Sequence, residues 1–195
     1  MRRNLLIAAA ISLLVIFATG GWLLTRKDKE APPVVFKAQS FEDKAMSLKF
    51  QYIQPLSVGM LTEQDKKDKF IARLSSTNPA MLVSVRYEDG LRIVANLAHV
   101  DTLDYLLQSA DKALPARYKD YRLISDRKLS VGNKKAAETT FTYTGPNGEK
   151  ARQRFLTIIK DDNTAIYISA QSSDSDYEAI NRDYFDQLFN SISFN

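Results

Sequence analysis

The sequence predicts an α+β fold in which an antiparallel β-sheet is sandwiched between helices and is preceded by one N-terminal transmembrane helix. Three observations lead to this prediction. Residues 136–170 contain three strand-like runs separated by short turns, two amphipathic helical patterns accompany the strands, and residues 5–24 carry no charge. Strands joined by such short turns pair as antiparallel hairpins, because a parallel pair needs a long crossover. The chain therefore divides into an anchor (1–25), a linker (26–45) and one domain (46–195).

The uncharged run from Leu5 to Leu24 is 20 residues long, about the length of an α-helix that crosses the hydrocarbon core. The residues assigned to this anchor are Leu5, Ile11, Val15, Phe17, Trp22 and Leu24. A cleaved signal peptide is the alternative, with Leu5–Phe17 as its core and the small residues Ala18 and Gly20 before the cut. We favour an uncleaved anchor, because the apolar run continues beyond that cut to spanning length.

Basic residues lie on both sides of the predicted span, so the charge rule that orients membrane helices is nearly balanced. Arg2 and Arg3 precede the span, and Arg26, Lys27 and Lys29 follow it. A tail of four residues ahead of a first span more often stays in the cytosol. We therefore predict a single-pass protein of the cell membrane whose domain is extracytoplasmic, either periplasmic or on the outer face.

The segment Asp28–Lys44 is charged, contains two adjacent prolines and shows no sustained period, so it is predicted to be a linker. The domain is expected to begin near Met46, and Pro55 ends its first strand. Gln64–Lys69 is interpreted as the solvated tip of a hairpin. The strands expected in this part are Leu48–Tyr52, Phe70–Leu74 and Met81–Tyr87.

The middle of the domain is predicted to be helical. Leu91–Val100 fits either a short helix or an irregular segment packed on the sheet. A clear helix follows, because Asp101 or Thr102 can cap it and apolar residues recur at helical spacing up to Leu114. Pro115 is expected to stop or kink this helix.

The central sheet has the clearest pattern in the sequence. A strand at Tyr121–Val131 turns at Gly132-Asn133 into Ala137–Thr144, where apolar and polar residues alternate. Arg152–Lys160 is apolar on both sides, which is most easily explained if both faces of the sheet are covered. Thr164–Ala170 is the last strand of this meander.

An amphipathic helix is predicted to close the domain. Ser175 and Glu178 have capping-box spacing at its start, and Ser173 and Asp174 are competing N-caps. Its apolar residues recur at steps of three or four and are Tyr177, Ile180, Tyr184, Phe185, Leu188, Phe189 and Ile192. Side chains of this size are stabilised by burial, so the helix is expected to cover the sheet.

This order of elements resembles the PsbP-like domain, known from the extrinsic subunit of photosystem II and from bacterial periplasmic relatives of the DcrB type. The motifs that carry the resemblance are the glycine turn Ser130–Ala136, the strand Ala165–Ala170 and the ending Phe189–Phe194. The resemblance covers about residues 46–195 and implies an α/β/α sandwich with a non-enzymatic, accessory or assembly role. Many bacterial members have a lipobox cysteine that this sequence lacks, and the predicted span would replace the lipid.

Composition excludes several kinds of site. The chain has no cysteine and one histidine, so disulfides, thiolate ligands, cysteine nucleophiles and imidazole clusters are excluded. His99 is interpreted as structural, because no triad is recognisable around it. The net charge is +4, with basic and acidic residues interspersed, so nucleic-acid binding is not expected. Glu138 and Glu149 are interpreted as ordinary solvated positions.

Two oxygen-rich clusters are candidate sites for a hard cation: Asp161 with Asp162, and Asp174 with Asp176. Neither has the spacing of an EF-hand loop, and turn formation or helix capping already accounts for them. No cofactor and no enzymatic activity are expected. We predict an accessory module that docks on an envelope or membrane protein through a sheet edge or a helix face. The alternative is a domain that binds a small ligand or a divalent cation in a cleft between sheet and helix.

Overall fold

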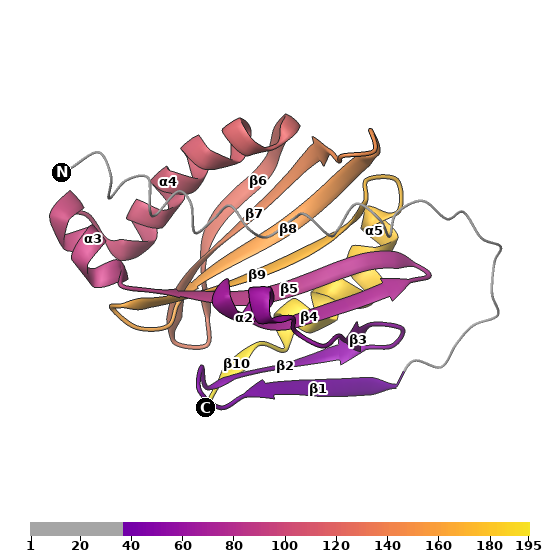
Figure 1. The fold of residues 1–195 in the computed structure, drawn as a ribbon, viewed down its shortest axis with the longest axis horizontal. Coiled ribbons are helices and arrows are strands. Elements are labelled where there is room, and N and C mark those ends of the chain that lie inside the picture. The colour runs from indigo at the N-terminus through magenta and orange to yellow at the C-terminus, as the bar shows by residue number, and fades with distance from the viewer. Residues whose placement is uncertain (1–36) are drawn as a thin grey trace.

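Two antiparallel sheets form the framework of residues 37–195, which are the residues that the computed structural model describes (Figure 1). The larger sheet has seven strands in the order β3-β4-β5-β9-β8-β7-β6. These strands are β3 (Ser57–Val58), β4 (Phe70–Thr77), β5 (Ala80–Asp89), β9 (Thr164–Ser173), β8 (Lys150–Ile159), β7 (Lys134–Thr144) and β6 (Lys119–Val131). The smaller sheet has three strands, β1 (Ala38–Asp43), β2 (Leu48–Ile53) and β10 (Ser193–Phe194), in the order β1-β2-β10.

The predicted meander is confirmed at the centre of the larger sheet. Strands β7, β8 and β9 pair in sequence, with Arg154 opposite Thr140 on one side and Ala170 on the other. Adjacent residues along most of β8 and β9 are buried, so both faces of the sheet are covered, as the two-sided apolar pattern predicted. Gly132 and Gly148 form the turns at φ +57° and +83°, a backbone region that side chains with a Cβ rarely adopt.

The C-terminal helix covers one face of the larger sheet. It consists of α5 (Tyr177–Ile180), a π-helical turn η3 (Asn181–Phe185) and α6 (Asp186–Asn190). All seven residues of the predicted apolar stripe are buried, and they join one core cluster with residues of β2, β4, β5, β8 and β9. The predicted capping box does not form. Asp176 is the N-cap residue without a side-chain cap bond, and the Glu178 carboxylate instead accepts a hydrogen bond from Arg152.

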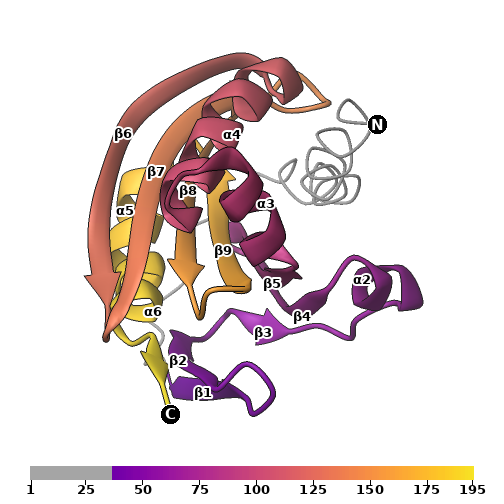
Figure 2. The same ribbon diagram turned by 90° about the vertical axis from the view of Figure 1, so that its left-hand side faces the viewer.

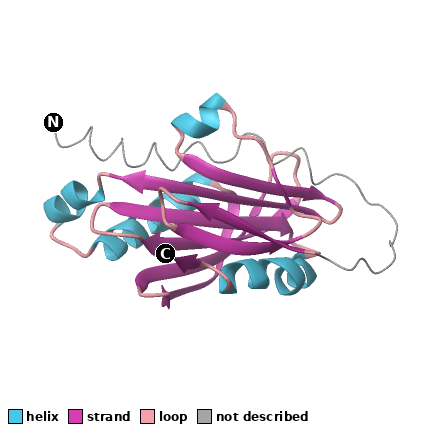
Figure 3. Ribbon diagram, turned by 90° about the horizontal axis from the view of Figure 1, so that it is seen from below, coloured by secondary structure: helices cyan, strands magenta, loops and turns pink. Residues whose placement is uncertain are grey.

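The opposite face is covered by α3 (Leu91–Ala98) and α4 (Thr102–Arg117), as Figure 2 shows. A second core cluster lies there, in which Leu106 and Leu114 pack with Phe141, Tyr143 and other residues of the sheet. The predicted cap is confirmed, because the Asp101 side chain accepts a hydrogen bond from the Leu103 N–H at 3.0 Å. Pro115 does not end α4, which continues to Arg117. The α+β class is therefore confirmed, with strands in the centre and helices outside them (Figure 3).

The start of the domain differs from the prediction. Ala38–Asp43, within the segment expected to be linker, forms β1 and pairs with β2, and the Phe41 and Phe50 rings stack at 4.9 Å. A short helix, α2 (Glu63–Lys67), stands where a hairpin tip was expected. Thr62 and Asp65 form a capping box at its start, and this pair of reciprocal hydrogen bonds explains why the charged segment is helical.

The predicted transmembrane run Leu5–Leu24, with all its anchor residues, lies outside the described residues. Among residues 37–195, no helix is both long enough and apolar enough to cross a bilayer.

Candidate interaction surface

Strand β6 forms one edge of the larger sheet and pairs with β7 alone (Figure 2). It is 13 residues long and exposed along most of its length, and Val131 is its one buried residue. On the unpaired side of such a strand, backbone N–H and C=O groups have no partner in the sheet, so an edge strand can accept another strand. This makes β6 the first candidate for the sheet-edge contact predicted from the sequence.

Two irregularities divide β6 into a distorted and a regular half. The pairing register shifts between Lys119 and Arg122 and again between Leu123 and Ser125. From Ser125 to Val131 the strand then pairs with β7 without interruption. Bulges twist an edge away from further pairing. The regular half, Ser125–Val131, is therefore the part of the edge with the geometry to receive another strand.

Apolar and basic side chains lie together along this edge. Leu123 and Ile124 are 50% and 49% exposed. The Arg127 side chain is 64% exposed, although its guanidinium donates to the Glu138 carboxylate at 2.9 and 3.1 Å. The Lys128 side chain is 62% exposed and donates to Asp104 of α4 at 2.5 Å. The domain's own carboxylates thus orient these two cations, which remain accessible to a partner.

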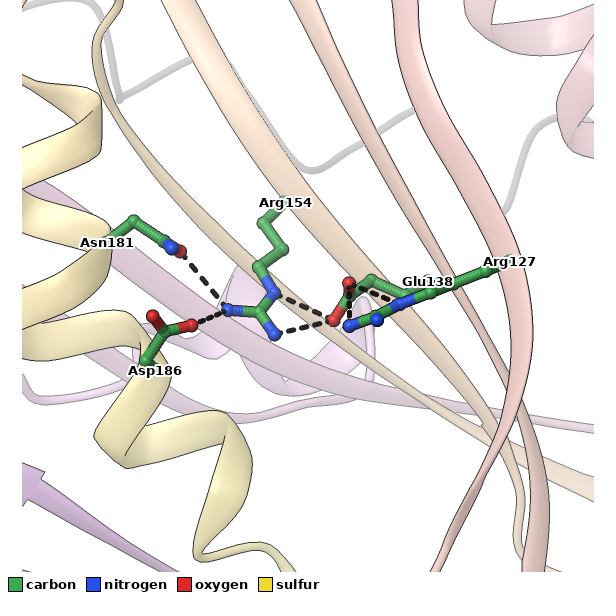
Figure 4. Close-up of polar contacts among 5 residues, drawn as sticks. All are labelled: Arg127, Glu138, Arg154, Asn181 and Asp186. Carbon is green, nitrogen blue, oxygen red and sulfur yellow. Dashed lines mark hydrogen bonds and ion pairs between the residues drawn. The ribbon is translucent and has the colours of Figure 1, made fainter.

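An ion-pair network centred on the buried side chains of Arg154 and Glu138 connects this edge to the rest of the fold (Figure 4). Arg154 of β8 donates to Glu138 of β7 at 2.7 and 2.8 Å, and to Asn181 and Asp186 of the C-terminal helix at 3.1 and 2.6 Å. The Arg154 guanidinium also lies over the Phe189 ring, 4.3 Å from its centre. One network therefore joins β6, β7, β8 and the C-terminal helix.

The interpretation of Glu138 as a solvated residue is wrong, because Glu138 is 8% exposed. It points to the face that the C-terminal helix covers, and two arginines share its carboxylate. The apolar pattern of the neighbouring strand β8 predicted that this strand is covered on both faces. The same reasoning could have indicated that Glu138 lies on a covered face. Arg127 lies opposite Glu138 in the predicted hairpin, so the register of the Gly132-Asn133 turn could have identified it, whereas the pairing of Arg154 with Asp186 depends on how the C-terminal helix lies on the sheet.

His99 lies directly after α3, is exposed and has a positive φ of 55°. No hydrogen bond to a serine or aspartate is recorded for it in the described part of the chain. Its position at the end of a helix agrees with the structural interpretation, because a left-handed residue commonly ends a helix.

The two aspartate clusters lie at opposite ends of β9, so the fold does not bring them together. The Asp161 carboxylate accepts the Asn163 N–H in the β8–β9 turn, and Asp162 pairs with Arg92 at 3.3 Å. Asp174 accepts from Arg152 at 2.7 Å, and Asp176 accepts from the Ser173 hydroxyl at 2.7 Å. Within residues 37–195, no group of three or more potential metal ligands is close enough to hold an ion.

A row of buried polar side chains lies on the face of the sheet that carries α4. Arg86 and Gln153 are 4% and 1% exposed, and the Arg86 guanidinium lies 4.8 Å from the centre of the Tyr167 ring. The Tyr167 hydroxyl donates to Glu88 at 2.9 Å. Burial raises the pKa of the Tyr167 phenol and lowers the pKa of the Arg86 guanidinium. The Tyr167 hydroxyl therefore stays protonated at neutral pH and acts as a hydrogen-bond donor.

Two solved structures share this fold at very low sequence identity. The cyanobacterial PsbP (CyanoP) from Synechocystis sp. PCC 6803 is 9% identical, with a TM-score of 0.53 over 87% of this chain and 98% of that one. LpqN, described as involved in cell envelope biogenesis of Mycobacterium tuberculosis, is 7% identical, with a TM-score of 0.53 over 83% of this chain and 92% of that one. The predicted PsbP-like fold is confirmed, and the relationship to DcrB-type proteins stays a prediction.

The comparison with curated proteins finds no match. A family model does match residues 75–193, from the end of β4 to β10, and its description is the serine/threonine kinase C-terminal domain. The matched segment contains β6, Glu138, Arg154 and the whole C-terminal helix. Because this match spans more than half of the sequence, the chain belongs to the family of serine/threonine kinase C-terminal domains.

Proposed function

We propose that this protein is a membrane-anchored, extracytoplasmic accessory module that acts by protein–protein contact and not by catalysis. Its contact surface is the edge strand β6, and its partner is a protein of the envelope or membrane. The family description names the C-terminal domain of a serine/threonine kinase, and a role in contact fits one domain of a larger protein. The description of LpqN as a protein of envelope biogenesis supports the same location.

The observation that carries this proposal is the exposure of β6. The regular half of the edge, Ser125–Val131, has an unpaired side, and Leu123 and Ile124, two aliphatic side chains about half exposed, lie directly before it. Adding a strand to an exposed edge is a common mode of peptide recognition, in which backbone hydrogen bonds supply affinity and alternate side chains supply specificity. The network around Glu138 and Arg154 keeps this edge rigid, and a rigid edge loses less conformational entropy on binding.

Site-specific photocrosslinking in the full-length protein, in its own membrane, tests the proposal. A photoreactive benzoylphenylalanine replaces Ile124 on β6, and the control carries it at Met60, which is 98% exposed and lies outside β6. We expect a discrete adduct of one partner mass with Ile124 and none with Met60. Equal adducts at both positions, or none at β6, would contradict the proposal. Protease treatment of sealed cells checks the side of the membrane, because an extracytoplasmic domain is digested without lysis.

A second candidate function, the binding of a small ligand between the sheet and α4, has one observation in its favour. The Gln153 side-chain oxygen is buried on the face of the sheet that carries α4, without a hydrogen-bond partner among the described residues. A buried carbonyl oxygen without a donor is costly, and a ligand hydroxyl or amine would satisfy it. Native mass spectrometry of the purified protein distinguishes the two functions: a retained small molecule, released by Gln153→Leu, favours the ligand.

A further inference from the structure

Helix α3 carries an apolar stripe that the rest of the domain does not cover. Ile93 and Leu97 are 64% and 69% exposed, and Val100, just beyond the helix, is 36% exposed. Ile93 and Leu97 are four residues apart, the spacing that places side chains on one face of a helix, and Val100 follows two residues after the helix ends at Ala98. The inner face of α3 packs on the domain, because Leu91 is 2% exposed and belongs to the core cluster beneath α4.

Exposed carboxylates of Asp89, Asp101 and Asp162 lie at the ends of this segment, so its apolar side chains and the absence of acidic residues within it favour a lipid surface. Residues 91–100 contain no acidic residue, and their charged or titratable side chains are Arg92 and His99, both exposed. Arg92 is 65% exposed even though it pairs with Asp162. An amphipathic helix with apolar side chains on one face and a flanking cation is the pattern of helices that lie in the membrane interface.

The length of chain before the described domain determines how far the domain can lie from a bilayer. The apolar run ends at Leu24, and residues 25–36 separate it from the first described residue. Twelve residues span at most about 40 Å when fully extended. In Figure 1, β1 begins at one end of the long axis and α3 lies at the other. The tether thus leaves room for the domain to lie with its long axis along the membrane and both ends near it.

We infer that the stripe Ile93, Leu97 and Val100 inserts into the membrane interface and gives the domain a second attachment, at the end opposite its tether. This inference rests on the membrane anchor of the proposed function. It also gives that function an orientation, because a domain held at two ends presents the same side to partners in the same membrane. The β6 edge, which is not part of the stripe, stays available for the protein partner.

The absence of cysteine from the sequence makes a direct test possible. Leu97→Cys is labelled with a nitroxide in the full-length protein, reconstituted in vesicles of phosphatidylcholine and phosphatidylglycerol. Ile124→Cys on β6, 49% exposed, is the matched control. We expect the label at Leu97 to be relaxed by oxygen, which concentrates in lipid, and protected from a water-soluble nickel chelate. The corresponding depth is about 5–10 Å below the headgroups. The label at Ile124 should show the opposite preference.

Each other outcome overturns the inference in a recognisable way. A label at Leu97 that the nickel chelate relaxes lies in water. A label protected from both reagents is covered by protein, either by residues 1–36 or by another chain, and dipolar broadening between labels would identify a second copy. Protein that does not float with the vesicles at all would disprove the anchor itself, whereas floating protein with a water-exposed Leu97 would disprove only the second attachment. Circular dichroism of both variants confirms that they are folded.

Discussion

Glu138 pairs with two arginines through one carboxylate, and Asp186 supplies a second carboxylate to Arg154. Arg154 is almost fully buried, and placing a guanidinium in such a site is costly unless it is paired and fully hydrogen-bonded. Its guanidinium makes four contacts, two with Glu138 of β7 and one each with Asn181 and Asp186 of the covering helix. The network is therefore a junction between layers of the fold, and removing its central acid leaves a buried cation with fewer partners.

Replacing Glu138 by alanine should lower the free energy of unfolding by about 3 kcal/mol, because breaking a buried pair leaves an uncompensated charge. Urea denaturation measures the change. Glu178→Ala is the matched control: Glu178 also pairs with an arginine, but its side chain is 79% exposed, so little change is expected. Equal effects of the two substitutions would show that Arg154 is not held by Glu138.

Asp65 predicts a pH dependence of stability. Burial would raise its pKa, but hydrogen bonds from Thr62 and the ion pair with Arg73 at 2.7 Å outweigh burial, so the pKa lies below the ordinary 3.8. A carboxylate with a lowered folded-state pKa stabilises the fold above its unfolded pKa, and this contribution is lost as the pH falls through the folded pKa.

Asp65→Asn should therefore flatten the decrease in stability between about pH 5 and pH 2. Urea midpoints measured across this range test it, with Glu63→Gln on the exposed side of the same helix as the control. If wild type and Asp65→Asn decline in parallel, the Asp65 carboxylate does not contribute.

At the scale of elements, hydrophobic periodicity predicted the helices and strands that pack on the core along their whole length. It missed short elements that are held by pairing with a neighbour or by a cap. The C-terminal stripe and the strands β7 to β9 were predicted correctly because their apolar residues follow one period over many positions. Strand β1 was missed because Phe41 is the one large apolar residue in Ala38–Asp43, and its pairing with β2 supplies the rest. Helix α2 was missed because a capping box, not an apolar face, holds its five residues.

The C-terminal helix gives the element-scale prediction. Leu188→Ala should destabilise the domain by about 2–5 kcal/mol, because Leu188 is fully buried and its removal leaves a cavity in the core. Gln187→Ala, on the adjacent exposed position, should change stability little. Thermal and urea unfolding measure both variants, and a loss below about 1 kcal/mol at Leu188 would mean that the helix does not pack on the sheet as described.

For the whole molecule, the fold class and the covered sheet were predictable, but the candidate surface was not. Tyr121–Val131 was expected to be a strand, yet no periodicity says which strand of a sheet lies at its edge. The edge position of β6 depends on the pairing of β5 with β9, which are distant in the sequence. This pairing places β3, β4 and β5 on the side of the meander opposite β6. The bulges in β6 could not be predicted from the sequence either.

The boundary of the domain is testable at this scale. A fragment of residues 37–195 should be more stable than one of residues 46–195 by about 2–4 kcal/mol, because the shorter fragment lacks Phe41, which stacks on Phe50. It also loses the hydrogen bond from the Tyr52 hydroxyl to Gln39, 2.7 Å long. Equal urea midpoints for the two fragments would assign β1 to the linker after all.

The small sheet has a consequence for how the protein is made. Its middle strand, β2, pairs with β10, and the Gln51 N–H donates to the Ser191 hydroxyl 140 residues further along the chain. After β2 has been synthesised, the ribosome must still synthesise nearly the whole domain before β2 can pair with β10. The smaller sheet therefore cannot be completed until residues 191–194 have left the ribosome, so the domain reaches its final structure late in synthesis.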